Sequence, residues 1–223
     1  MSTVPHVTDP RARESRVINP NTGRASHKRK PEIRRAATQQ FRKHSYSGTS
    51  MDMIAAALNL NKGTLYHYYR GKSEILFDIV LLPLRSLADI IDTIPDDLTL
   101  QEQFRTLIRV SVEQSVEWND EIGVYFQEMR WLTQWLDADQ IGAVRKYENR
   151  YSERIRTLLM RAQRSGEFTD IDPTAVRHAI AGMNGFVFSW FDPDGRLTVA
   201  QIAEEYSRLV LDGLITRRAS TDA

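Results

Sequence analysis

Residues 49–76 read TSMDMIAAALNLNKGTLYHYYRGKSEIL, and this stretch decides the fold. Thr49 can cap a short helix, because its hydroxyl can accept a hydrogen bond from a free backbone amide and Asp52 adds a favourable charge in the first turn. The segment 59–61 predicts a turn, since asparagine adopts left-handed backbone angles at modest cost. A second short helix follows over 62–69. Two short helices joined by a polar three-residue turn predict a helix-turn-helix.

The side chains of this motif divide into an apolar set and a polar set. The apolar positions have the spacing that fills the wedge between two helices: Ile54, Ala55, Leu58, Leu60 and Leu65. The second helix carries donors and amphipathic aromatics: Lys62, Thr64, Tyr66, His67 and Tyr68. Such side chains can reach phosphates and base edges in a major groove about 12 Å wide. The second helix is therefore predicted to read DNA.

Positive charge gathers in the first third of the chain. The 223 residues have a net charge of +1, yet residues 1–72 hold 14 Lys and Arg against 4 Asp and Glu, while residues 73–223 hold 16 against 25. A basic segment joined to an acidic remainder indicates a polyanionic partner, and nucleic acid is the first candidate because phosphate contacts release counterions. A solvated basic tail without any partner is the alternative.

The quoted stretch resembles the DNA-binding signature of the TetR family of regulators. The family pattern is a capping Thr, an Ile-Ala pair, a short turn, Lys-Gly-Thr-Leu-Tyr-x-Tyr-Phe, a short break and Lys-x-x-Leu. This chain departs mildly from it, with Tyr69 for the usual Phe, Asn59 for the usual Gly and Gly71 for a frequent Ser. The resemblance implies an all-α homodimer with an N-terminal DNA-binding head and a larger helical effector domain, in which Leu65 and Tyr69 belong to the core. It also implies these residues at the DNA: Thr49, Ser50, Lys62, Gly63, Thr64, Tyr66, His67, Tyr68 and Lys72.

The rest of the chain also predicts helices, nine in total, with no strand. Capping patterns mark helix starts at Thr99, Asp172 and Thr198. One helix is expected over 119–136, and Pro83 predicts a bend in the fourth helix.

Three segments are expected along the chain. Residues 1–27 are rich in proline and polar residues and predict a disordered basic arm, which could track phosphates. Helical periodicity begins at His27, so we assign 28–72 to a helix-turn-helix DNA-binding domain and 73–223 to an effector-binding and dimerisation domain.

The acidic domain is rich in aromatic residues and methionine, which suit a bulky apolar ligand, although apolar stripes at helical spacing are usually core. The candidate effector pocket comprises Trp118, Tyr125, Met129, Trp135, Tyr151, Met183, Phe186 and Trp190. By the family resemblance the last two helices pair with a second copy, and the candidate dimerisation residues are Ala179, Gly182, Gly185, Ile202, Tyr206, Leu209 and Gly213. The stretch 190–198 resembles a branch of actinobacterial repressors of sterol-ring and acyl-thioester catabolism.

These observations predict a ligand-responsive transcriptional regulator, a repressor that releases a palindromic operator when an acyl-CoA or steroid-derived CoA thioester binds. A DNA-binding protein that acts through a protein partner is the alternative. An enzyme is not expected, since the five histidines lack metal-binding spacing and no nucleophile or phosphate-loop motif occurs. Without cysteine there is no disulfide or thiolate chemistry, and we expect no metal or cofactor. The polar N-terminus lacks a secretory signal, so we expect a cytoplasmic protein without a membrane partner.

Overall fold

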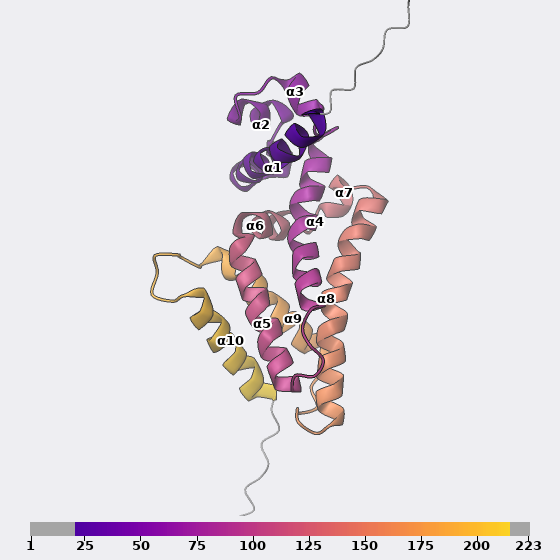
Figure 1. Cartoon of the computed structure of the whole chain (residues 1–223), viewed down its shortest axis with the longest axis vertical. Coiled ribbons are helices and arrows are strands. Elements are labelled where there is room, and N and C mark those ends of the chain that lie inside the picture. The colour runs from indigo at the N-terminus through magenta and orange to yellow at the C-terminus, as the bar shows by residue number, and fades with distance from the viewer. Residues whose placement is uncertain (1–20, 215–223) are drawn as a thin grey trace, which may run out of the picture.

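A computed structural model describes residues 21–214, and every regular element among them is helical, as the all-α prediction requires (Figure 1). Ten α-helices and one 3-10 turn occur where the sequence predicts nine helices. They are α1 (Asn21–Gly48), α2 (Met51–Ala57), α3 (Lys62–Tyr66), α4 (Lys72–Ile91), α5 (Leu100–Glu117), α6 (Asn119–Glu128), α7 (Leu132–Trp135), α8 (Ala138–Arg164), α9 (Pro173–Gly185), η1 (Val187–Ser189) and α10 (Val199–Leu214).

The additional helix arises because the helix predicted over 119–136 is divided in two. The backbone tightens after Glu128, where the N–H of Trp131 donates to the Glu128 carbonyl at 2.8 Å, only three residues back. Glu128 is buried while Met129 and Trp131 are exposed, so the chain turns outward here and α7 restarts the helix.

Two helix starts differ from the sequence prediction. Helix α1 begins at Asn21 rather than near His27, so part of the predicted disordered arm is helical, and residues 1–20 lie outside the described residues. The cap of α2 is Ser50 rather than Thr49, because the Ser50 side chain accepts the N–H of Met53.

Other local predictions are confirmed. Helix α1 is interrupted at Ser45, which has a φ of 60°, close to the expected stop. Thr99 and Glu102 form a capping box at α5, and Asp172 caps α9 with a proline in its first turn. Thr198 and Gln201 exchange the capping hydrogen bonds expected before α10.

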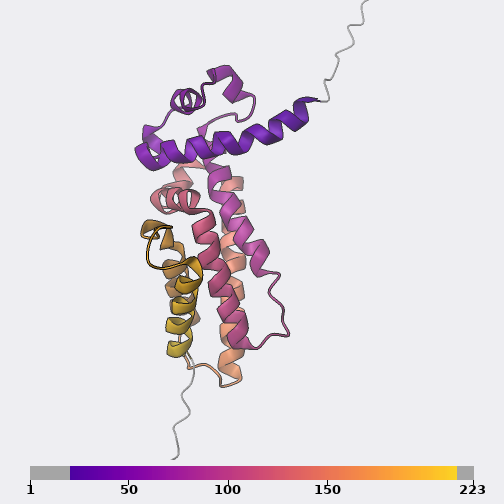
Figure 2. The same cartoon turned by 60° about the vertical axis from the view of Figure 1, so that its left-hand side comes forward.

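The helices form a small head on top of an elongated bundle. Helices α1, α2 and α3 make the head, and α4 runs from the head down into the bundle of α5, α8, α9 and α10 (Figure 1). In Figure 2, α1 lies across the upper end of the bundle, directly above α6. None of the described helices combines the length and hydropathy that a bilayer span requires.

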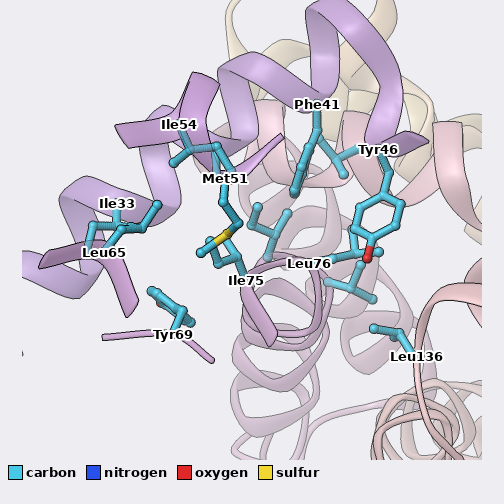
Figure 3. Close-up of a cluster of buried hydrophobic side chains, with 14 of the residues drawn as sticks. Ile33, Phe41, Tyr46, Met51, Ile54, Leu65, Tyr69, Ile75, Leu76 and Leu136 are labelled. Carbon is cyan, nitrogen blue, oxygen red and sulfur yellow. The ribbon is translucent and has the colours of Figure 1, made fainter. Parts of the chain in front are cut away.

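One hydrophobic core joins the head to the upper bundle. It includes Ile33, Ile54 and Leu65 of the head, and it continues to Val144 of α8 and to Leu136, just after α7. Figure 3 shows Leu136 near Tyr46, at the end of α1. The packing therefore crosses the boundary that the sequence predicts at residue 72, and the head rests directly on the effector domain.

Candidate DNA-binding face and effector cavity

Helix α3 is short and is held by its own cap. The Oδ1 atom of Asn61 accepts hydrogen bonds from the backbone N–H of Thr64 at 2.7 Å and from its hydroxyl at 2.9 Å. Leu65 is fully buried, which anchors the inner face of the helix. Tyr66 is 45% exposed and His67 is exposed. The recognition helix thus presents an aromatic and an imidazole on its outer side.

Lys62 adds a positive charge to the same outer face. Its ammonium contacts the carboxylate of Asp52 at 3.0 Å, and both side chains are more than half exposed. The hydrogen bond to Asp52 raises the pKa of Lys62, so the ammonium is charged at neutral pH. An ion pair this exposed contributes little to stability, because solvent screens it. Lys62 can therefore exchange Asp52 for a phosphate at little cost.

Thr49 and Lys72 were expected at the DNA, but the structure directs both inward. Thr49 is 3% exposed, and its hydroxyl lies 2.8 Å from the carbonyl of Ser45 and 3.1 Å from that of Gln40. The ammonium of Lys72 donates to the carbonyls of Tyr46 at 2.6 Å and Thr49 at 2.7 Å. Burial lowers the pKa of Lys72. Both residues fix the corner between α1 and α2, because the carbonyls that they bind lie before, at and after the break in α1.

The remaining residues of the motif are either exposed to solvent or packed against the core. Ser50 and Gly63 are exposed, and Tyr68 is partly buried against the core. Tyr69 is buried, as predicted, and its hydroxyl donates to Asp78 at 2.8 Å. Burial is the larger cause that raises the pKa of Tyr69, and the hydrogen bond to Asp78 raises it further.

A cavity of about 40 Å³ lies between α4, α5 and α6 in the effector domain. It is lined by Val80, Pro83, Leu84, Leu87, Ser111, Gln114, Ser115, Ile122 and Tyr125. Tyr125 is the one candidate pocket residue among them. The α4 residues escaped the sequence analysis because their spacing is that of any core stripe. The usable signal was on α5, where Ser111, Gln114 and Ser115 interrupt an apolar helix face at helical spacing.

The other candidate pocket residues lie elsewhere. Three are exposed, Met129 by 46%, Phe186 by 54% and Trp190 by 46%, and therefore do not enclose a cavity. Four are partly buried but do not line the cavity: Trp118, Trp135, Tyr151 and Met183. Trp135, for example, packs on Tyr46 with a ring separation of 5.0 Å. Trp135 thus packs the end of α7 against the end of α1.

The candidate dimerisation residues also separate into two groups. Four have exposed positions on α9 and α10: Ala179, Gly182, Leu209 and Gly213. Ile202 is 1% exposed and belongs to the core of its own chain, and Tyr206 is partly buried. At Gly185 an added Cβ would lie 2.6 Å from the ring of Phe126, so this glycine serves packing within the chain. The exposed group remains available for a partner.

Comparison with known proteins places this architecture in a family. Residues 97–214 match the model described as tetracyclin repressor-like, C-terminal domain, and residues 33–79 match bacterial regulatory proteins, tetR family. This chain belongs to the TetR family. It is accordingly a helix-turn-helix transcriptional regulator and not an enzyme.

Several TetR-family relatives align along nearly their whole length. The repressor KstR2 of Mycolicibacterium smegmatis is 24% identical over 200 residues, covering 87% of this chain and 95% of the relative. The structure of the ketosteroid transcriptional regulator KstR2 of Mycobacterium tuberculosis shares the fold, with a TM-score of 0.77 at 21% identity over 85% of this chain and 96% of that one. AibR, solved in complex with isovaleryl coenzyme A and operator DNA, has a TM-score of 0.69 at 26% identity. The match covers 81% of this chain and 97% of AibR.

Proposed function

We propose that the chain is a homodimeric repressor that binds a palindromic operator and releases it when a CoA thioester binds the effector domain. The exposed face of α3, which includes the ammonium of Lys62, carries this proposal. Lys62, Tyr66 and His67 are presented together by a helix whose other side is anchored by Leu65. In helix-turn-helix dimers two such helices enter major grooves about 34–36 Å apart, which makes the operator palindromic.

A second chain completes the DNA-binding unit. Leu209 is 66% exposed on α10, a larger exposed fraction than that of any other large apolar residue in the described part of the chain. Ala179 and Gly182 on α9 are small and exposed, which permits close approach of another helix. We propose that these faces of α9 and α10 pair with their copies. The regulator would act in the cytoplasm, where its DNA lies.

The effector class follows from the relatives and from the cavity. AibR was solved with isovaleryl coenzyme A, and KstR2 is named a ketosteroid regulator, so both a short acyl thioester and a steroid-derived thioester are candidates. The cavity between α4, α5 and α6 favours a small-molecule effector over a regulator that acts only through a protein partner.

Helix α6 offers the route from the cavity to the DNA-binding head. Ile122 and Tyr125 line the cavity, while Glu121 pairs with Arg34 of α1 at 3.8 Å. Glu128, at the end of the same helix, binds the backbone near the end of α1. A ligand that displaces α6 would therefore shift α1 and change the spacing of the two recognition helices. The coupling cannot exceed the difference in the ligand's affinity for the two states.

Fluorescence anisotropy on the DNA upstream of the chain's own gene tests the proposal. Isovaleryl-CoA, a steroid-derived CoA thioester and free CoA are titrated onto the complex. We expect specific binding to the palindrome and release by a thioester but not by CoA alone. Specific binding that no thioester releases would favour a protein partner, and absence of specific binding would contradict the assignment of α3.

A further inference from the structure

The first turns of helix α1 leave the DNA-binding head and carry positive charge. Residues 21–31 hold four Lys and Arg and no Asp or Glu. Arg29 pairs with Glu32 at 2.5 Å, which still leaves an excess of positive charge in this segment. In Figure 2 this end of α1 reaches beyond α2 and α3. A basic segment that extends from the body of a protein favours contact with a polyanion.

Lys30 connects this basic segment with the recognition helix. Its ammonium lies 4.6 Å from the centroid of the Tyr69 ring, and Tyr69 comes three positions after the end of α3. Deeper in the head, Ile33 of α1 and Leu65 of α3 belong to one buried cluster and lie together in Figure 3. The packing therefore holds the basic part of α1 beside the end of α3.

Arg70 adds a second cation at the same place. It is exposed and follows Tyr69 directly in the chain. The carboxylates around Tyr69 have other partners, because Glu74 accepts the backbone N–H of Arg70 at 2.6 Å and Asp78 accepts the hydroxyl of Tyr69 at 2.8 Å. Among the side chains that the structure describes, no carboxylate forms an ion pair with the ammonium of Lys30 or the guanidinium of Arg70.

These two cations lie where a short recognition helix requires a phosphate contact. Helix α3 has five residues and is about 7.5 Å long, whereas the major groove is about 12 Å wide and has a phosphate backbone on each side. Lys62 stands at the start of α3. The ammonium of Lys72 donates to two carbonyls of its own chain. Lys30 and Arg70 therefore provide, beyond the end of α3, the positive charge that Lys72 was expected to provide.

We propose that Lys30 and Arg70 form a phosphate-binding patch that contacts the DNA backbone beside the recognition helix. The ring of Tyr69 holds the Lys30 ammonium in place before DNA binds, so less conformational freedom is lost on binding. Phosphates carry no sequence information, so the patch raises the affinity for any duplex and leaves the choice of sequence to α3. This inference rests on the proposed function, because it extends the same DNA-binding face.

The salt dependence of DNA binding tests the patch in Lys30→Gln and Arg70→Gln. Fluorescence anisotropy is measured on two duplexes of equal length, the palindrome upstream of the chain's own gene and a scrambled sequence. We expect each variant to lower the slope of log Kd against log salt by about 1 per half-site, and to weaken binding about fivefold per half-site near physiological salt. Both duplexes should be affected equally, so the ratio of their Kd values should stay parental.

Lys146→Gln is the matched control, because Lys146 also lies over a tyrosine ring, that of Tyr147 at 5.9 Å, but on α8. It should leave the slope and both Kd values unchanged. Arg70→Gln removes no contact with the Tyr69 ring, so it tests the patch even if Lys30→Gln lowers the thermal unfolding midpoint.

The outcomes separate this patch from the proposed function. A parental slope for Arg70→Gln, together with a parental slope for a folded Lys30→Gln, would overturn the inference. A loss of preference for the palindrome at a parental slope would also overturn it, because the residue would then read bases. If the parent protein itself does not prefer the palindrome, the proposed function fails, while the slopes on the scrambled duplex still report on the patch.

Discussion

The carboxylate of Glu128 accepts a hydrogen bond from the backbone N–H of Tyr46 at 2.9 Å, across 82 positions of sequence. Glu128 is 4% exposed, and the same oxygen accepts the Nε2 of Gln127 at 3.1 Å. Gln127 also donates to the carbonyl of Phe41 at 2.9 Å. The end of α6 therefore holds the last turn of α1 through two side chains. The hydrogen bonds join the effector domain to the DNA-binding head.

Removing the acceptor should loosen this junction. Glu128→Ala leaves the N–H of Tyr46 buried without a partner, which costs about 1–3 kcal/mol. Urea denaturation should show that loss. Glu128→Gln is the control, because its amide oxygen can still accept from Tyr46, and we expect it to retain most of the stability. Equal losses in both variants would show that the charge, not the acceptor, stabilises the junction.

A second contact between α1 and α6 depends on Gly123. A Cβ at this position would overlap the guanidinium of Arg42, which lies over the ring of Phe188 at 5.3 Å. At Gly142 of α8 a Cβ would meet nothing within 4 Å. Gly142→Ala should therefore raise the free energy of unfolding by about 1 kcal/mol through helix propensity. Gly123→Ala should gain much less, because Arg42 must move and a cation–π contact of about 0.5–1 kcal/mol is lost.

The free energy of unfolding of the two glycine variants, measured by heat or urea, checks this prediction. Each variant is made both in the parent protein and in a protein that carries Arg42→Ala. Once Arg42 is absent, Gly123→Ala should stabilise the protein as Gly142→Ala does. If Gly123→Ala already matches Gly142→Ala in the parent background, then Arg42 does not occupy the space above α6.

The exposed face of α3 predicts a defined salt dependence. Lys62→Ala should weaken operator binding and lower the slope of log Kd against log salt by about 1, as expected for the loss of one phosphate contact. Tyr66→Ala should abolish specific binding while the dimer persists. Lys146→Ala, on the exposed surface of α8, is the control and should leave binding and slope unchanged. A parental slope for Lys62→Ala would remove this residue from the DNA contact.

The apolar surface of α10 predicts the oligomeric state. Leu209→Glu places a charge on a residue that is 66% exposed in one chain, so folding should be unaffected while dimer formation is lost. Light scattering after size exclusion should report a monomer, and operator binding should fall with it. Met129→Glu changes another exposed apolar residue, on the α6–α7 link, and serves as the control. A dimer that survives Leu209→Glu would place the interface on another face.

Local sequence determined the elements whose interactions span a few residues. The capping box of Thr99 and Glu102, the cap at Asp172 and the burial of Leu65 follow from neighbours in the chain or from helical spacing. The recognition helix could be predicted for the same reason, because its inner and outer faces are fixed by one turn of helix. The burial of Tyr69 is implied by the family resemblance.

Tertiary structure alone decided the roles that depend on distant partners. Lys72 is the basic residue that the motif places after the second helix. Its ammonium is nevertheless drawn inward, because it donates to the carbonyls of Thr49 and Tyr46, which lie 23 and 26 positions earlier in the sequence. Gly185 resembles a residue for helix pairing, but the ring of Phe126 occupies its open side. Which residues line the cavity depends on how α4, α5 and α6 are rotated against one another. The spacing of apolar residues shows that a helix has an apolar face. Which residues that face contacts is decided by how the other helices pack against it.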